Sequence, residues 1–311
     1  MGTPEFAVPA LRATIAACDV AAVVTRPDRP RGRGLGVAAS AVARIAEQLQ
    51  VPVMRPEDVN AADARAALEA LAADLFAVVA FGAILSPATL ALPKLGCMNL
   101  HGSLLPDYRG ASPVQRALWD GRAGTGVTTL WMDEGIDTGD LVLQRWLGIE
   151  PTDDAGSLAA RLAEAGGPLL AESLTLAHAG RAPRRPQDRT AGSYARKLDK
   201  SQGVVDWGRD AVTVWNRQRA VTPWPGAATA FRDRHLLLVR TEPQHLMPLG
   251  VAPGTVVEAG RDAVVIACAP GALSLVTVRP EGRGDLTAVE WARGARIQAG
   301  DRLMIEKEAH A

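Results

Sequence analysis

The sequence predicts an α/β fold in which a doubly wound, mostly parallel sheet is followed by a smaller β-barrel or sandwich. Near-continuous apolar runs at Cys18–Thr25, Asp74–Gly82 and Gly96–His101 have the composition of buried strands, and segments with helical apolar spacing separate them. From Val204 onward, short β-branched runs alternate with Gly, Pro and charged turns, which is typical of a small barrel or sandwich.

The chain opens with a glycine-containing turn and a helix, over Met1–Ala17. In a doubly wound fold such a turn normally follows a strand, so about six residues of an apolar strand are expected before it. The alternative is a domain that begins with its helix. Helical spacing then predicts helices over Val37–Gln50 and Ala61–Ala73, on either side of a short strand at Val51–Met54.

The first domain continues with a helix, two strands and a long helix. These elements are expected at Ala111–Gly121, Gly126–Met132, Leu141–Ile149 and Ala155–Ala177. The prolines and charges of residues 180–200 mark a basic linker. We therefore expect one domain over 1–179, with its first strand lacking, and a second over 201–311.

Composition and charge exclude several classes of protein. The 34 basic and 34 acidic residues give a formal net charge of +0, so binding to nucleic acid must come from local basic patches. Cys18, Cys97 and Cys268 are too sparse for a disulfide framework or a zinc site, which favours a reducing compartment. An apolar run of membrane-spanning length and a signal-peptide pattern are both lacking, so the expected location is the cytoplasm.

The stretch NLHGSLLPDYRGASP holds the first candidate site residues. Asn99 and His101 stand two positions apart at a strand end, so their side chains share one face. Ligands of parallel α/β sheets bind beyond the carboxyl ends of the strands, so both side chains are expected at the mouth of a site, with Ser103–Pro106 along its wall. The alternative is a pair of buried polar side chains that bond only to nearby backbone.

Asp137 lies in the acidic, turn-rich segment DEGIDTGD. A carboxylate brought to His101 by folding would hold the orientation of that ring and favour its charged form. The alternative for any one of these acids is a turn in which the side chain caps backbone amides. The spacing lacks the ligand pattern of an EF-hand loop, so a metal site is not expected.

The loop DRPRGRGLG carries Arg29, Arg31 and Arg33 among glycines. It has neither the Gly-Lys-Ser/Thr of a P-loop nor the GxGxxG fingerprint of dinucleotide binding. Basic residues on a mobile loop suit a phosphate backbone, although a solvated surface loop remains the alternative. The GxSxG and HExxH motifs of hydrolases and metalloproteases are also lacking.

Taken together, these motifs resemble the methionyl-tRNA formyltransferase family of folate-dependent formyltransferases. NLHGSLLP with IDTGD marks the wider group, and DRPRGRG with the TPWPGA region narrows it to the tRNA enzymes. The similarity also includes GTPEFAVP, VVAFGAIL, GVTTLWMDEGIDTGD and SYARKLDKSQGVVDW, so it covers nearly the whole chain. This sequence differs from the family at its start, where the family has a strand before the segment that corresponds to Gly2–Pro4.

The resemblance implies a Rossmann-like catalytic domain, an OB-like C-terminal barrel, a monomer and no metal. The implied donor is 10-formyltetrahydrofolate, and the implied acceptor is the α-amino group of methionyl initiator tRNA. Its implied catalytic residues are Asn99, His101 and Asp137. Its implied folate-binding residues are Ser103, Leu104, Leu105, Pro106, Phe81, Gly82, Ile84 and Leu85. Its implied tRNA-binding residues are Arg29, Arg31, Arg33, Arg184, Arg185, Lys197 and Lys200.

Three alternatives remain open at this point. A folate-dependent formyltransferase with a small-molecule amine acceptor, such as a glycinamide ribonucleotide or a nucleotide-linked amino sugar, would use the same catalytic residues. A formyl-folate hydrolase is less expected, because no additional domain precedes the catalytic one in this sequence. A catalytically inactive RNA-binding protein is the alternative outside enzymes, and the intact Asn99, His101 and Asp137 argue against it.

Overall fold

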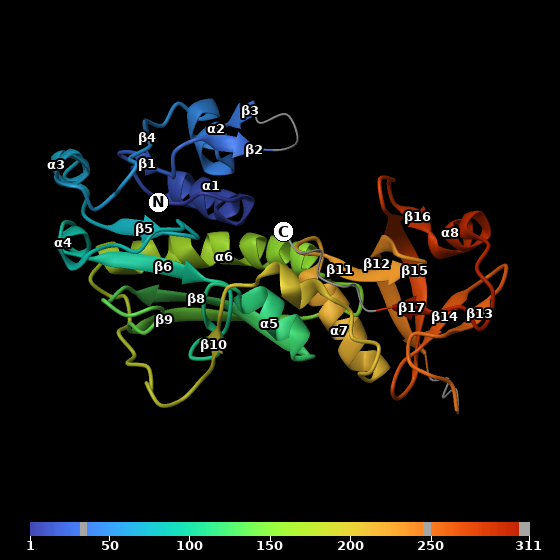
Figure 1. Ribbon diagram of the computed structural model, residues 1–311. Helices are drawn as coiled ribbons and strands as arrows, with labels where there is room; N and C mark the ends of the chain where they lie inside the picture. The colour runs from blue at the N-terminus through green and yellow to red at the C-terminus, as the bar shows by residue number, and fades with distance from the viewer. Residues whose placement is uncertain (32–35, 245–249, 305–311) are drawn as a thin grey trace. The chain divides into compact units, whose positions relative to one another are not determined.

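The computed structural model describes residues 1–31, 36–244 and 250–304 (Figure 1). The chain divides into two compact units, each of which is described separately. The first unit contains Met1–Pro113, Gly124–Gly148 and Ala159–Ala195, and the second contains Val114–Ala123, Ile149–Leu158 and Arg196–Ala311. The segment expected as a linker is therefore divided, since residues 180–195 pack within the first unit.

Parallel strands form the first part of the sheet in the first unit. Strand β1 (Val23–Val24) pairs with β4 (Val53–Met54), and β5 (Phe76–Val78) pairs with β6 (Cys97–His101), both in parallel. Met1–Gly2 lies between β1 and β5. The Gly2 amide donates to the Val24 carbonyl at 3.0 Å, and Gly2 forms a parallel bridge with Val79 on the other side.

The other side of the sheet is antiparallel. Strand β8 (Gly124–Trp131) pairs with β6, and β9 (Leu141–Gly148) pairs with β8, both in antiparallel register. The connection from Trp131 to Leu141 is shorter than the dozen or more residues that a parallel crossover requires. The predicted doubly wound α/β domain is confirmed. Its strands form the parallel pair β1-β4 and the mixed four-stranded sheet β5-β6-β8-β9, and Met1–Gly2 lies between the two.

Helices cover this sheet, as Figure 1 shows for the long helix α6. The helices of the first unit and their bounds are η1 (Glu5–Ala7), α1 (Val8–Ala17), α2 (Ala41–Gln48), α3 (Ala62–Ala70), α4 (Pro87–Leu90) and most of α6 (Ala155–His178). Helix α2 begins later than predicted because the Ser40 side chain caps it by accepting from the Ala43 amide. The residues before it form β3 (Gly36–Ala38), which pairs with β2 (Arg29–Arg31) in a hairpin.

The second unit is built around a curled antiparallel sheet. Its strands are β11 (Ala227–Phe231), β12 (Arg234–Gln244), β13 (Val256–Ala259), β14 (Val264–Ala267), β15 (Ala272–Pro280), β16 (Leu286–Thr287) and β17 (Leu303–Met304). They follow the order β13-β14-β15-β12-β11-β17, and β16 pairs with β15. The Val256 amide donates to the Asp301 carbonyl at 2.7 Å, just before β17, so the sheet curls into a half-barrel. The strand pattern had predicted a small barrel or sandwich, and the structure selects the curled form.

Helices α5 (Pro113–Trp119), α7 (Ala211–Val221) and α8 (Ala288–Ala295) complete the chain, with the 3-10 turn η2 (Lys200–Gly203). The alternation of β12 decides which of its side chains enter the core of the second unit. Leu236 and Leu238 are each 1% exposed, whereas Leu237 between them is only half-buried. Trp207, Phe231 and Trp291 fill the same core.

Candidate active site

Asn99, His101 and Asp137 converge at one point of the first unit. Asn99 and His101 project from β6, and Asp137 reaches them from the 132–140 loop that follows β8. The Asn99 Nδ2 donates to Asp137 Oδ1 at 3.2 Å, and the His101 Nδ1 lies 3.5 Å from Asp137 Oδ2. The side chains of His101 and Asp137 are 7% and 14% exposed, so this contact is largely shielded from water.

Both ring nitrogens of His101 face oxygens that only accept hydrogen bonds. Nε2 lies 2.9 Å from the Tyr108 carbonyl, and Nδ1 faces the Asp137 carboxylate. A neutral imidazole has a single N–H and would leave one of these contacts without a proton, whereas the imidazolium donates to both. These two contacts fix the orientation of the ring.

Two groups outside the predicted trio hold Asp137 in place. The Gly110 amide donates to Asp137 Oδ2 at 2.8 Å, while the Gln187 Nε2 donates to the Asp137 carbonyl at 2.9 Å and to the Gly139 carbonyl at 2.7 Å. Asp137 has a φ of 56°, in the left-handed region where a residue with a side chain is strained by about 1–3 kcal/mol. The bonds to its backbone and carboxylate compensate for that strain and fix the carboxylate opposite His101.

Gln187 is itself held by a buried arginine. The Arg109 guanidinium donates to Gln187 Oε1 from Nη2 at 3.0 Å and from Nε at 3.3 Å, and it also donates to the carbonyls of Asp188 and Ala191. Arg109 is 9% exposed, so these bonds replace its hydration. The segment predicted as a linker is thus attached to the active-site loop through Gln187.

A short parallel pairing supports the same region. Strand β7 (Arg109–Gly110) pairs with β10 (Tyr194–Ala195). Gly110 has a φ of 105°, and a Cβ built on it would lie 2.8 Å from the Ala195 carbonyl oxygen and 3.0 Å from the Tyr194 ring. Glycine is therefore required at 110, where the backbone both turns and presents its amide to Asp137.

The predicted folate segments leave the same edge of the sheet, because β5 and β6 are parallel neighbours. Within 81–85, Ile84 is 76% exposed and Gly82 is also exposed, whereas Phe81 and Leu85 are buried in the hydrophobic core. The remaining predicted folate residues, Ser103, Leu104, Leu105 and Pro106, are buried or half-buried. The Ser103 hydroxyl donates to the Asp107 carbonyl at 2.6 Å, so it shapes the turn after β6.

The predicted tRNA residues are spread over both units. The backbone of Arg29 and Arg31 belongs to β2, whereas Arg33 lies outside the described residues. In the first unit the Arg184 guanidinium lies 4.2 Å from the centre of the Trp131 ring, and the Arg185 Nη2 donates to the Val142 carbonyl at 2.8 Å. In the second unit Lys197 and Lys200 are exposed.

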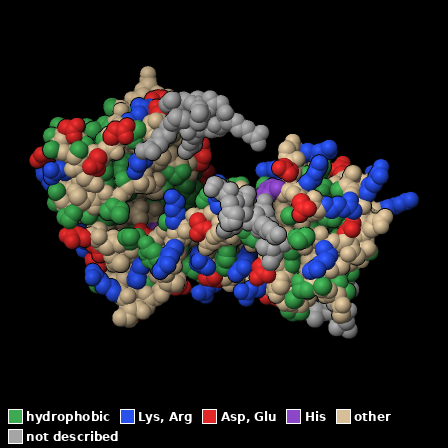
Figure 2. Space-filling view, viewed as in Figure 1, with side chains coloured by type: hydrophobic (Ala, Val, Ile, Leu, Met, Phe, Trp, Pro, Cys, Tyr) green, Lys and Arg blue, Asp and Glu red, His purple; other side chains and the backbone are tan. Residues whose placement is uncertain are grey.

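Charged side chains of both signs are interspersed over the face seen in Figure 2. Lys and Arg side chains are prominent on the C-terminal unit there. Across residues 1–31, 36–244 and 250–304, no group of three His, Cys, Asp or Glu side chains is placed to hold a metal ion. Within those same ranges, no helix combines the length and the apolar character that crossing a membrane requires.

The chain matches two described sequence families in order along its length. Residues 5–174 match "Formyl transferase", and residues 197–296 match "Formyl transferase, C-terminal domain". The curated methionyl-tRNA formyltransferase of Geobacter sulfurreducens is 41% identical over 309 residues, covering 97% of this chain and 95% of the relative. The curated methionyl-tRNA formyltransferase of Stenotrophomonas maltophilia is 44% identical over 299 residues, covering 95% and 96%.

Solved structures share the fold at lower identity. An N-formyltransferase from Helicobacter canadensis, in complex with folinic acid and dTDP-3-aminofucose, superposes with a TM-score of 0.64 at 17% identity, over 88% of this chain and 96% of the other. HypX from Aquifex aeolicus in complex with tetrahydrofolic acid superposes with a TM-score of 0.58 at 22% identity, over 79% of this chain and 43% of the other. The matched region is therefore less than half of HypX.

The converging side chains and the curled sheet each lie within one of the matched regions. Asn99, His101 and Asp137 all lie within the region that matches the first family, and the curled sheet of the second unit lies within the region that matches the second. Both regions are present, and relatives at 41–44% identity cover nearly the whole chain. The chain therefore belongs to the formyl transferase family.

Proposed function

We propose that the chain transfers a formyl group from 10-formyltetrahydrofolate to the α-amino group of methionyl initiator tRNA, for the initiation of translation. The observation that carries this proposal is the convergence of Asn99, His101 and Asp137. Curated relatives that cover nearly the whole chain are named for this reaction, which supports both the reaction and the acceptor.

The acceptor amine needs little activation. A free α-amino group has a pKa of about 7.7–8.0, and the neighbouring ester lowers the pKa of the methionyl amine further. Much of the amine is therefore neutral at pH 7 and can attack the formyl carbon directly. The species that requires stabilisation is the tetrahedral intermediate, whose oxygen carries the negative charge.

Asn99 and His101 supply the hydrogen-bond donors for that oxygen. The Asn99 amide has two N–H groups, and Asp137 engages one of them, which leaves the second for the oxyanion. His101, when protonated, donates a further N–H and adds a positive charge beside it. Preorganised donors of this kind are each worth about 10²–10³ in turnover.

Asp137 and His101 carry the protons. Asp137 accepts the proton that the amine loses when its nitrogen bonds to the formyl carbon. His101 gives a proton to N10 of the folate as the bond between the formyl carbon and N10 breaks. Transfer of the proton from Asp137 to His101, across the contact of 3.5 Å, then restores both groups for the next turnover.

The folate donor is proposed to bind along the two segments that leave β5 and β6. Gly82 and Ile84 offer accessible backbone and an exposed apolar side chain, and Ser103–Pro106 form the facing wall. Buried Phe81 and Leu85 support the first segment from within the core. The Helicobacter canadensis relative, which has the same fold, is described in complex with folinic acid, a formylated folate, which supports a folate at this place.

An acceptor assay tests the reaction. Purified protein is incubated with labelled 10-formyltetrahydrofolate and, separately, with methionyl initiator tRNA, glycinamide ribonucleotide, a nucleotide-linked amino sugar, or no acceptor. We expect label to be transferred to the tRNA alone. Transfer to a small amine would replace the proposed acceptor, and release of free formate without acceptor would identify a hydrolase.

The tRNA is proposed to bind through local basic side chains, which include Arg29, Arg31, Arg33, Arg184, Arg185, Lys197 and Lys200. We expect the affinity to fall steeply with salt, because each phosphate contact releases bound counterions. Replacing both Lys197 and Lys200 by Ala should make the slope of log K against log salt shallower by about 1 per lost contact.

The control for this prediction is Arg44→Ala. Arg44 is exposed and pairs with Glu5 at 2.8 Å, so it is already neutralised within the protein. Filter binding over a range of potassium chloride measures the slope for each variant. An unchanged slope in the double lysine variant, or an equal change in the control, contradicts the proposed contacts.

The proposal places the enzyme in the cytoplasm as a monomer. Initiator tRNA is charged and used where translation begins, and one copy of the chain contains the whole trio. Analytical ultracentrifugation with and without tRNA checks the monomer, for which we expect a single species of 32.7 kDa in the free protein.

A further inference from the structure

The segment 81–86 follows β5 and carries part of the proposed folate site. Phe81 and Leu85 are 3% and 4% exposed and pack in the same core, whereas Ile84 between them is 76% exposed. The segment therefore presents an apolar side chain to solvent from a backbone whose neighbours are fixed. Such a side chain suits contact with the ring system of a folate, so the groups that fix this backbone bear on donor binding.

Side chains from distant parts of the chain hold the carbonyl groups of this segment. The Thr3 hydroxyl donates to the Phe81 carbonyl at 2.9 Å, and the Arg26 Nη1 donates to the Gly82 carbonyl at 2.9 Å. Gly82 has a φ of 82°, in the left-handed region that favours glycine. The two bonds therefore fix the segment where its backbone turns.

Asn60 makes more of these contacts than Thr3 or Arg26. Its Nδ2 donates to the Ile84 carbonyl at 2.9 Å, and its Oδ1 accepts from the Ser86 amide at 2.8 Å and from the Thr89 hydroxyl at 2.9 Å. A carbonyl only accepts and a backbone amide only donates, so this network defines the orientation of the Asn60 amide. The side chain bonds the backbone on both sides of residue 85, as a neighbouring strand would.

Asn60 is itself fixed in place. Its backbone amide donates to Asp58 Oδ1 at 2.9 Å. The preceding residue, Val59, is 3% exposed and packs in the same core as Phe81 and Leu85. The Asn60 side chain and the segment that it holds are thus anchored to one core, so removing the side chain frees the outer part of the segment and leaves the core intact.

We call the set of Thr3, Arg26 and Asn60 the carbonyl clamp. Each member follows a piece of the parallel part of the fold: Thr3 follows Met1–Gly2, Arg26 follows β1, and Asn60 follows β4. Ligands of parallel α/β sheets bind beyond the carboxyl ends of the strands. The carbonyl clamp therefore holds the segment at the edge of the fold where a ligand is expected.

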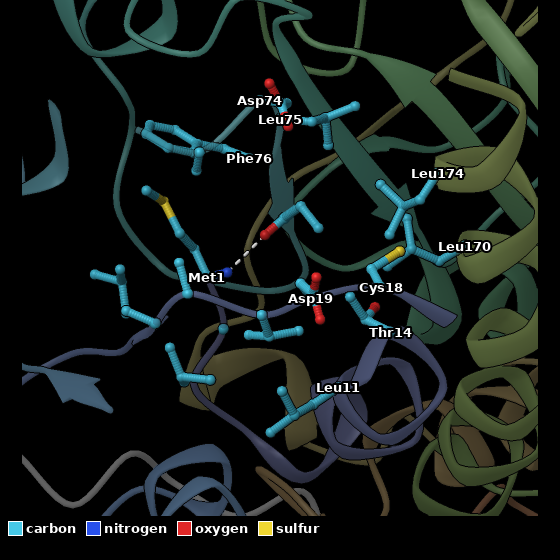
Figure 3. A pocket seen from close by; sticks show the side chains of 18 of the residues that line it. Met1, Leu11, Thr14, Cys18, Asp19, Asp74, Leu75, Phe76, Leu170 and Leu174 are labelled. Atoms are coloured by element: carbon cyan, nitrogen blue, oxygen red, sulfur yellow. Dashed lines mark hydrogen bonds between the residues drawn. The ribbon is translucent and has the colours of Figure 1, made fainter. Parts of the chain in front are cut away.

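The carbonyl clamp is separate from a cavity of about 590 Å³ that lies between β1 and β5. Figure 3 shows Leu11, Leu170 and Leu174 among the side chains around that cavity. Among the described residues that line it, none belongs to the carbonyl clamp or to the segment 81–86. The contacts of the carbonyl clamp therefore concern the proposed folate segment and not this cavity.

We propose that Asn60 is a positioning residue for the folate donor, which acts by holding the backbone of Ile84 and Ser86 in the form that receives the folate. The inference rests on the proposed function, since it takes 81–86 as part of the donor site. In the described part of the chain, the side-chain bonds of Asn60 go to residues 84, 86 and 89 and not to the catalytic trio. Without them fewer molecules hold the binding-competent form, so donor affinity falls while the chemical step is unchanged.

Two variants, Asn60→Ala and Asn60→Asp, test the inference. Calorimetry measures the Kd of folinic acid in the absence of any acceptor, and formylation of methionyl initiator tRNA at saturating donor measures kcat. We expect the Kd to rise by about tenfold or more in both variants, and kcat to change by less than about threefold. Asp keeps an oxygen for Ser86 and Thr89, so an equal effect in both variants assigns the loss to the bond with the Ile84 carbonyl.

The matched control is Ser86→Ala. It removes the hydroxyl that caps α4 by accepting from the Thr89 amide at 3.2 Å, and it keeps the Ser86 backbone amide that Asn60 holds. We expect a lower Tm, because a helix cap is lost, and a Kd of folinic acid within about twofold of the unaltered chain. If Ser86→Ala raises the Kd as far as Asn60→Ala does, general destabilisation explains the effect and the inference is wrong.

Hydrogen exchange gives a direct readout of the segment. The amides of residues 82–86 should exchange at least about fivefold faster in Asn60→Ala, while those of β5 and β6 stay protected. An unaltered chain that does not bind folinic acid overturns the proposed function, and this inference with it. If the unaltered chain binds and Asn60→Ala binds equally tightly, or loses kcat instead of affinity, the inference alone is overturned.

Discussion

Asp137→Asn is expected to lower kcat by about 10²–10⁴-fold, because the variant loses both the proton acceptor and the counter-charge of His101. The two side chains have similar volumes, and the Asn side chain still offers an oxygen to the Gly110 amide. The fold should therefore be retained. The affinity for methionyl initiator tRNA should stay within about twofold, since this carboxylate carries the opposite sign to a phosphate-binding group.

The measurement combines single-turnover formylation with filter binding of the tRNA. Asp140→Asn is the matched control, because it removes one negative charge from the end of the same loop and keeps the trio intact. We expect near-normal kcat in the control. If tRNA affinity falls as far as turnover in Asp137→Asn, the carboxylate serves binding rather than proton transfer, and the proposed mechanism is wrong.

Gln187→Leu is expected to lower kcat by about 10²-fold while the KM values for donor and acceptor change little. The variant removes the two N–H bonds that hold the Asp137 and Gly139 carbonyls, and the left-handed backbone at Asp137 is then free to relax. A displacement of about 1 Å at a catalytic group lowers the rate by about 10²-fold, even when the chemistry of that group is unchanged. Gln187 is thus a positioning residue that acts through Asp137.

Gln187→Glu separates the two sets of bonds that Gln187 makes. Glu keeps an oxygen for Arg109 but has no N–H for the carbonyls of Asp137 and Gly139. If the loop contact controls turnover, Glu should be as impaired as Leu, and both should alter the pH profile of kcat. Restored turnover in Gln187→Glu, or a Leu variant with lower Tm but normal kcat, would show that the residue has only a structural role.

Part of the active site follows directly from local pattern. A spacing of two on a strand places Asn99 and His101 on one face, and the glycine after His101 ends the strand there. The structure has both residues on β6, as expected. The pattern also predicted the buried strands and the change to short strands after residue 204, because periodicity is a property of the local sequence.

No pattern in the local sequence indicated a role for Gln187. It lies in a segment whose prolines and charges indicated a linker, and nothing in its neighbours distinguishes it from a solvated glutamine. Its role depends on Arg109, which is far away in sequence and is buried against it. The same holds for Gly110, whose amide matters only because Asp137 lies opposite. Contacts between segments that are distant in the sequence cannot be inferred from the spacing of neighbouring residues.

The sequence by itself determined the fold class, the strand and helix patterns and the pair Asn99 and His101, because backbone periodicity and side-chain alternation depend on neighbouring residues. The tertiary structure decided that Asp137 meets His101, that Gln187 and Gly110 hold it, and that β8 and β9 run antiparallel. It also decided that a cavity lies between β1 and β5. These features depend on how distant segments share space, which is settled only when the whole core packs.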